Sequence, residues 1–236
     1  INAFAMPGGY IGINSGLITT AESESELASV VGHEVAHVTQ RHIAQLFGKQ
    51  GEASMIMLAS MLVAVLASRS SSQLSEAAVF AGQAGAIQSQ LSYTRAFERE
   101  ADRIGLQALE GAGFDVRGMP SFFERLQRST RVYENNAPDY LRTHPLTQER
   151  IADMSTRVGQ MQYRQVADSL DFRLVRAKLR AADGLATDAI ALFQAELAKA
   201  PDNAISRYGL ARALLRAGKT TEAAQQLQQI RDAGQL

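Results

Sequence analysis

The chain has 236 residues, of which 24 are basic and 24 acidic, so its formal net charge at pH 7 is zero. A balanced charge gives no general attraction for nucleic acid or anionic lipid, and we expect no nucleic-acid partner. Cysteine is absent, which excludes disulfides, zinc ribbons and a thiol nucleophile. Any bound metal must therefore be held by histidine and carboxylate side chains, in a chain long enough for two domains of about 100–200 residues.

Residues 1–9 contain no basic segment followed by an apolar run, so we expect no signal peptide within them and expect the native polypeptide to begin upstream. Residues 8–18 alternate large apolar residues between glycines, which predicts a short strand and then a turn. We expect an edge strand to which an extended substrate adds by main-chain pairing, with a purely structural hairpin as the alternative. The candidate substrate-binding residues are Gly9, Tyr10, Ile11 and Gly12.

A helix is predicted from Ser23 to about Phe47. Ser23 and Glu26 have the spacing of a capping box, and apolar residues then recur at helical intervals. His42 is expected on the exposed surface of this helix.

The predicted helix contains the sequence H-E-x-x-H, from His33 to His37. Residues four apart lie on one face of a helix, so the two histidines can bind one zinc ion while Glu34 lies beside its open coordination position. This arrangement predicts metal-assisted hydrolysis of peptide bonds.

A catalytic zinc site normally has three protein ligands and one water. A third histidine at the metzincin spacing would fall on Ile43, which excludes that class. A carboxylate from a later helix is the remaining common solution, and Glu98 and Asp102 are four apart on one helical face, with Glu100 pointing elsewhere. We expect Glu98 to bind zinc and Asp102 to accept a hydrogen bond from a ligating histidine.

The longest apolar run covers residues 55–67 and is interrupted only by Ser60. It is shorter than the roughly 20 residues that span a bilayer. A buried helix is expected; the alternative is a flap or surface that makes peripheral contact with a membrane or an apolar substrate. Whether residues 55–92 form an ordered pair of helices or a mobile gate is left open, and a further helix is predicted over residues 93–109.

From residue 168 onward the sequence is rich in Ala, Leu, Gln and Arg with helical spacing. Shifted against itself by 34 residues, it aligns Gly184 with Gly218 and Ala189 with Ala223. This period and these small residues are typical of tetratricopeptide repeats, with an ordinary helical bundle as the alternative.

Three motifs occur in order: H-E-x-x-H, then E-x-x-x-D from Glu98 to Asp102, then His144-Pro145 with Arg150 six residues after the histidine. Together they resemble the zinc metallopeptidase family that contains HtpX and the CAAX prenyl proteases, over residues 2–151. With the repeats, the chain is most similar to the soluble periplasmic branch of that family.

The resemblance implies a mainly α (α+β) fold. A zincin-like, gluzincin-type metallopeptidase domain with a small β-sheet would occupy residues 1–160, and a tetratricopeptide-repeat module residues 168–236. It implies one Zn²⁺ per chain, bound by His33, His37 and Glu98, with Glu34 as general base.

The resemblance also assigns His144 and Arg150 to the stabilisation of the oxyanion. His144 could instead sit on a lid that occupies the fourth zinc position, or be a plain loop residue, and Arg150 could form a structural ion pair; these alternatives stay open.

By resemblance, the chain is a periplasmic endopeptidase of Gram-negative bacteria. Its substrates would be unfolded polypeptides, namely misfolded or stalled outer-membrane and envelope proteins, and its repeats would bind a protein partner such as the outer-membrane assembly machinery. A chaperone or adaptor with a latent zinc site is the main alternative, and a structural zinc site in a scaffold protein is the third.

Overall fold

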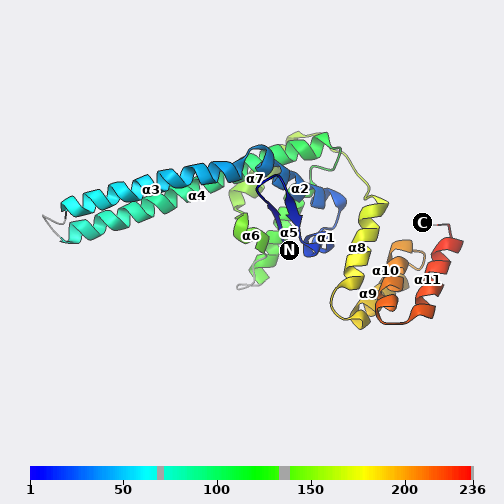
Figure 1. The fold of residues 1–236 in the computed structure, drawn as a ribbon. Coiled ribbons are helices and arrows are strands. Elements are labelled where there is room, and N and C mark those ends of the chain that lie inside the picture. Colours follow the sequence, from blue (N-terminus) through cyan, green and yellow to red (C-terminus); the bar gives the residue numbers. More distant parts are fainter. Residues whose placement is uncertain (68–71, 133–138, 235–236) are drawn as a thin grey trace.

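The computed structural model describes residues 1–67, 72–132 and 139–234. The chain is mainly α-helical with one small antiparallel sheet, which confirms the predicted fold class. Figure 1 shows a long helical hairpin on one side, a central bundle, and a row of short helices on the other side. Among the described helices, none combines the length and hydropathy that crossing a bilayer requires.

The chain begins with the two strands β1 (Ala3–Ala5) and β2 (Ile11–Ile13), paired antiparallel with Ala3 opposite Ile13. Gly8 and Gly9 close the connecting turn with φ angles of 90° and 84°, a region that side chains rarely tolerate. The predicted strand is therefore only partly correct: β2 includes Ile11 and Gly12, whereas Gly9 and Tyr10 lie in the turn and before the strand. Helix α1 (Ser15–Thr20) follows at once.

Helix α2 (Glu24–Thr39) starts where the sequence predicts, since the Ser23 side chain accepts a hydrogen bond from the Glu26 backbone N–H at 3.2 Å. The predicted continuation to Phe47 is wrong. Arg41 has a φ of 56°, in the left-handed region, which ends α2 and starts a separate helix α3 (His42–Ala67).

Helices α3 and α4 (Ser72–Gly111) run side by side as the long hairpin that projects from the central bundle in Figure 1. The prediction of a buried helix over residues 55–67 is wrong, because Met55 is 71% and Leu62 68% exposed. Helical periodicity identifies a helix but not its partner, and here α4 covers only one side of the apolar segment.

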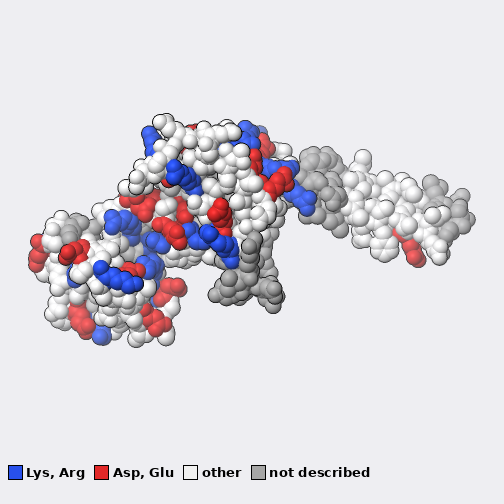
Figure 2. All heavy atoms as spheres, turned by 180° about the vertical axis from the view of Figure 1, so that it is seen from behind, with Lys and Arg blue, Asp and Glu red and all other residues white. Residues whose placement is uncertain are grey.

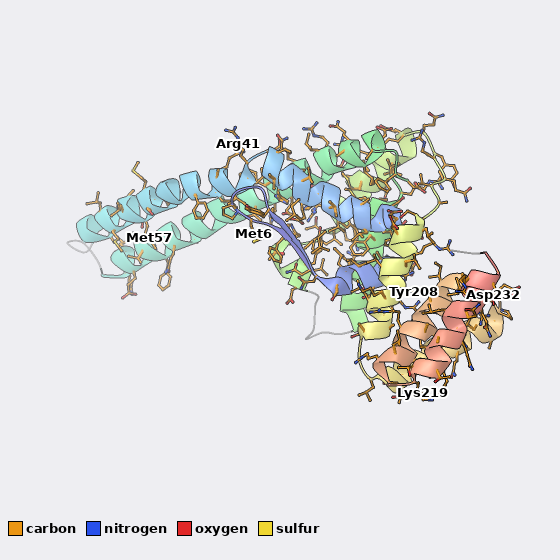
Figure 3. The ribbon with its side chains drawn as sticks, turned by 45° about the vertical axis from the view of Figure 1, so that its right-hand side comes forward. Met6, Arg41, Met57, Tyr208, Lys219 and Asp232 are labelled. Carbon is orange, nitrogen blue, oxygen red and sulfur yellow. The ribbon has the colours of Figure 1, made fainter. Side chains whose placement is uncertain are left out.

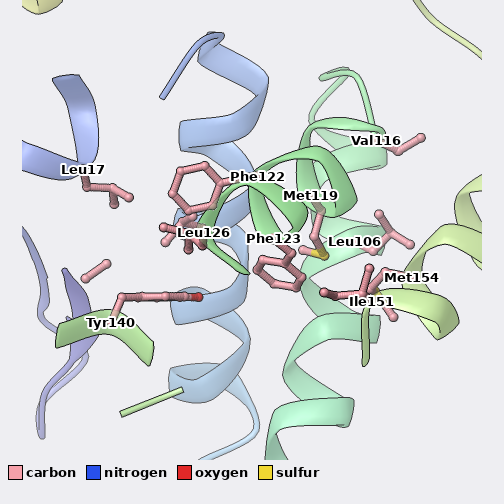
Figure 4. Packing of buried hydrophobic residues seen from close by; sticks show 12 residues of the cluster. Leu17, Leu106, Val116, Met119, Phe122, Phe123, Leu126, Tyr140, Ile151 and Met154 are labelled. Carbon is pink, nitrogen blue, oxygen red and sulfur yellow. The ribbon is translucent and has the colours of Figure 1, made fainter. Parts of the chain in front are cut away.

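The central bundle comprises the sheet, α1, α2, the C-terminal part of α4, and α5 (Gly118–Val132), α6 (Asp139–Thr143) and α7 (Gln148–Gln160). Its core is rich in aromatic and sulfur-containing side chains, most of which come from α5, α6 and α7 (Figure 4). The largest fully buried members are Tyr140, Phe122, Phe123, Leu17, Met119, Leu126 and Met154.

Four helices complete the chain: α8 (Leu170–Ala182), α9 (Ala186–Lys199), α10 (Ala204–Arg216) and α11 (Thr220–Asp232). Helices α10 and α11 each begin 34 residues after α8 and α9, the period that the sequence predicts. Gly184 and Gly218 occupy equivalent turns with φ angles of 54° and 76°. Gly209 faces the ring of Phe193 so closely that an added Cβ would collide with it.

Candidate active site

The site lies where α2 crosses α4. Two glycines allow this close crossing: a Cβ on Gly105 would lie 2.9 Å from the backbone nitrogen of His33, and one on Gly32 would lie 3.1 Å from the Gly105 carbonyl oxygen. The crossing faces the H-E-x-x-H segment of α2 toward Glu98 and Asp102 of α4.

Four side chains converge on one point, and each offers a metal-ligand atom within 4.8 Å of all the others. They are His33, His37, Glu98 and His144, and all are buried. The Nε2 atoms of His33 and His37 are 3.0 Å apart, and they lie 3.4 Å and 3.3 Å from the two carboxylate oxygens of Glu98. Two imidazoles and a carboxylate are the donor set of a gluzincin-type catalytic zinc site, so these residues fit the metal.

Asp102 lies behind His33, with its Oδ1 2.9 Å from the Nδ1 of that histidine. An acceptor at Nδ1 fixes the ring with Nε2 directed at the metal. Burial raises the pKa of the Asp102 carboxyl, but the hydrogen bonds from Arg150 and the adjacent His33 ring outweigh burial and hold that pKa below its usual value. Asp102 is therefore an anion at neutral pH.

Arg150 is 4% exposed, and each nitrogen of its guanidinium contacts a carboxylate or a carbonyl oxygen. It donates to both Asp102 oxygens at 2.7 Å, to the Pro145 carbonyl oxygen at 2.7 Å, and lies 2.9 Å from Glu98 Oε2. This geometry supports the alternative of a structural ion pair, in which Arg150 orients two carboxylates, over direct contact with an oxyanion.

His144 lies between α6 and α7 and reaches the metal-ligand cluster. Its Nδ1 is 3.1 Å from Glu98 Oε1 and 3.3 Å from His33 Nε2, and its Nε2 is 3.3 Å from Glu34 Oε1. The ring stacks on Tyr140 with centroids 4.7 Å apart. The position is compatible with both roles that the sequence leaves open, a transition-state contact and a fourth ligand.

Glu34 is fully buried, and its carboxylate accepts no hydrogen bond from the described side chains. Burial raises the pKa of this carboxyl, while the neighbouring His144 and His33 oppose the rise. A buried carboxyl group with few hydrogen-bond donors is costly unless water or a cation approaches it. Glu34 is thus suited to exchange protons beside a bound metal.

The two metal-facing histidines differ in their surroundings. Burial lowers the pKa of His33, but contacts with Asp102 and Glu98 outweigh burial and raise this pKa to about 9. Burial lowers the pKa of His37 to about 4, despite its contact with Glu98. Burial therefore favours the neutral imidazole at His37, the form that binds a metal, whereas His33 must release a proton when a metal binds.

Two residues of the site were not predicted. His42, expected on the helix surface, is 1% exposed, and its Nδ1 lies 2.9 Å from the Nδ1 of His37. Tyr140 is fully buried against His144 and has its centroid 6.5 Å from that of His33. The only signal for His42 in the sequence was a third histidine close to the motif, and Tyr140 carried none.

A hollow of about 280 Å³ adjoins His37. Its lining combines the turn between the strands with the end of α2 and the start of α3. Met6 and Arg41, two of the lining residues, are labelled in Figure 3. Of the predicted substrate strand, Gly9 borders this hollow, whereas Ile11 and Gly12 belong to β2. The lining residues are Met6, Pro7, Gly8, Gly9, His37, Val38, Arg41, Ile43, Ala44 and Phe47.

Comparison with known proteins agrees with this geometry. The chain is 41% identical over 178 residues to the beta-barrel assembly-enhancing protease of Escherichia coli K12, covering 75% of this chain and 36% of the relative. It is 37% identical over 233 residues to the protein of that name from Yersinia pestis, covering 97% and 47%. A mitochondrial metalloendopeptidase OMA1 of Arabidopsis thaliana is 33% identical over 150 residues, covering 64% and 28%.

The chain thus spans less than half the length of these relatives. Residues 180–236 match a tetratricopeptide repeat, which confirms the repeats predicted from the 34-residue period. Residues 1–158 match the sequence model of a zinc-dependent family, and the chain therefore belongs to peptidase family M48.

Proposed function

We propose that the chain is a zinc metalloendopeptidase of the gluzincin type. The observation that carries this proposal is the convergence of His33, His37 and Glu98 on one point, with the buried Glu34 beside it. A bound zinc ion would activate water and polarise the scissile carbonyl group.

In this proposal, the protein supplies proton transfer and orientation. Glu34 accepts a proton from the attacking water and returns it to the leaving amine. Asp102 holds His33, and Arg150 holds Asp102 and Glu98, so that the ligands keep their geometry through the cycle.

The test is digestion of casein by the purified chain beside the Glu34→Gln variant at equal zinc occupancy. Glutamine keeps the size of the side chain but cannot accept the proton, so we expect zinc binding without cleavage. Cleavage by both proteins at the same rate would contradict the role of Glu34. Zinc binding without cleavage by the parent would favour a chain that acts by binding alone.

A latent site is the second candidate, because His144 completes a group of four donors. In that state His144 takes the fourth position and excludes the catalytic water. We expect His144→Ala to increase casein cleavage if the histidine is a lid. A decrease of roughly 10²–10³-fold would instead assign it to the transition state.

For the substrate, we propose unfolded or misassembled outer-membrane proteins in the Gram-negative periplasm. The support is the name of the bacterial relatives, which concerns β-barrel assembly. We further propose a peptidase domain over residues 1–160 and a repeat module over residues 168–236 that recruits a protein partner, such as the assembly machinery. Cross-linking of the Glu34→Gln variant in periplasm should capture unassembled barrel proteins, and capture of folded barrels alone would contradict the proposal.

We also propose that the hairpin of α3 and α4 makes peripheral contact with a lipid bilayer. Met61, Leu62 and Val63 are successive residues, so they point in directions about 100° apart, yet they are 50%, 68% and 54% exposed. A groove on a partner protein would cover only one face of these residues, whereas lipid can contact apolar side chains that point in several directions. Figure 2 shows almost no charge there, and residues 53–94 contain only Arg69 and Glu76 as charged residues.

The membrane proposal predicts flotation with uncharged phosphatidylcholine vesicles that is insensitive to salt. Leu62→Glu should abolish flotation, while Leu185→Glu, at a leucine 67% exposed in the repeats, should not. If the parent does not float with vesicles but forms a dimer that Leu62→Glu dissociates, the hairpin instead binds a second copy of the chain.

A further inference from the structure

We propose that His42 is a positioning residue for the zinc ligand His37, and that the break between α2 and α3 places His42 in contact with this ligand. This inference rests on the proposed metal site and extends it to a residue outside the three family motifs.

The helix break decides where His42 lies. In a continuous helix, residues five apart point about 140° away from each other, at roughly 100° per residue. In the structure, Arg41 adopts a φ of 56° and the chain turns, which brings the ring of His42 to 4.9 Å from that of His37. A left-handed conformation at a residue other than glycine costs about 1 kcal/mol or more, and such outliers persist where the surroundings enforce them.

The contacts of His42 form a directed chain. Its Nδ1 lies 2.9 Å from His37 Nδ1, and its Nε2 lies 3.3 Å from Glu100 Oε2. If His37 binds the metal through Nε2, its proton is on Nδ1 and is donated to His42 Nδ1. The proton of His42 is then on Nε2 and is donated to the Glu100 carboxylate, so a single tautomer assignment satisfies every atom.

This chain mirrors the contact behind the other ligand. His33 is oriented by Asp102 through its Nδ1, at 2.9 Å. His37 has no carboxylate at its own Nδ1 among the described residues, and His42 relays the carboxylate of Glu100 to it. A carboxylate therefore orients His33 directly and His37 through His42, and α4 supplies the carboxylate in both cases.

Packing is the competing explanation, because the His42 ring also stacks on Phe97 with centroids 4.4 Å apart. Two variants separate the explanations. His42→Phe keeps a stacking ring but loses both hydrogen bonds, whereas His42→Asn loses the ring but can place an amide oxygen near the position of Nδ1.

The experiment measures zinc affinity by chelator competition, with thermal unfolding of the zinc-free proteins as a check on folding. We expect His42→Phe to bind zinc about 10–100-fold more weakly, the usual effect of removing such a partner. His42→Asn should bind at least several-fold more tightly than His42→Phe. The reverse order would overturn the proposal and leave His42 as a packing residue.

A second measurement covers the case in which neither variant folds. Glu100 has a side chain 40% exposed, so Glu100→Ala should fold, and we expect weaker zinc binding than in the parent. Nitrogen-15 NMR of the zinc-loaded parent should show His37 protonated at Nδ1 and His42 at Nε2. Unchanged affinity in Glu100→Ala together with the opposite tautomers would overturn the proposal, whereas a parent that binds no zinc would overturn the metal site itself.

Discussion

At the scale of single residues, the site is organised by one buried cation among several carboxylates. Arg150 contacts Asp102 and Glu98, and these in turn contact His33 and His37. Burial of charges is costly, and this group is sustained because each charge contacts an opposite charge or a hydrogen-bonding group. Removing one member leaves the others buried without compensation.

Arg150→Lys should therefore destabilise the chain although it keeps the charge. Lysine cannot donate in the forked geometry that reaches both Asp102 oxygens at 2.7 Å. We expect a loss of about 3 kcal/mol in the free energy of unfolding by urea, together with weaker zinc binding. Arg157→Lys is the control, since its pair with Asp153 is exposed and should contribute under about 1 kcal/mol. Equal stability of parent and Arg150→Lys would show that the ion pair is dispensable.

At the scale of elements, the sequence predicted those features that depend on local chemistry. The cap at Ser23 and the end of α4, predicted at residue 109 and found at Gly111, follow from residues close in sequence, and the 34-residue period follows from the repetition of small residues. The same holds for the candidate ligands, since helical spacing places His33 with His37 and Glu98 with Asp102. The start of α4 at Ser72 was not predicted, since the expected helix began only at residue 93. The break at Arg41 could not be predicted, because no glycine or proline marks it. The exposure of α3 and the position of Tyr140 depend on contacts distant in sequence, which periodicity does not reveal.

The crossing of α2 and α4 provides a test at this scale. Gly105→Ala would place a Cβ 2.9 Å from the His33 backbone nitrogen, so the helices must separate and carry Glu98 away from the histidines. We expect zinc affinity to fall at least tenfold and stability to fall by about 1–3 kcal/mol, the range for overpacking. Gly111→Ala, at the end of the same helix, meets nothing within 4 Å and should change neither quantity. Tight zinc binding by Gly105→Ala would show that the site tolerates a wider crossing.

At the scale of the whole molecule, the central bundle and the repeats have separate hydrophobic clusters. They are joined by the packing of α1 against α8 and by a small polar contact. Glu24, at the start of α2, accepts hydrogen bonds from the Ser169 backbone N–H at 2.7 Å and from its hydroxyl at 3.0 Å. The Glu24 backbone N–H in turn donates to Asp168 at 2.7 Å. Partly exposed hydrogen bonds of this kind contribute about 1 kcal/mol each, so they orient the repeats without merging the two clusters.

Zinc should therefore stabilise only one part of the molecule. All four candidate donors belong to the central bundle, and none lies in α8–α11. At a free zinc concentration 1,000 times the Kd, binding stabilises the folded form by about 4 kcal/mol. Calorimetry with and without a chelator should thus show two transitions, of which only that of the central bundle shifts to lower temperature on zinc removal. A single transition that shifts as a whole would mean that the contact at Glu24 and the packing of α1 against α8 couple both clusters into one cooperative unit. Glu24→Ala should then weaken this coupling and move the two transitions apart, because it removes both hydrogen bonds to Ser169 and leaves the zinc donors untouched.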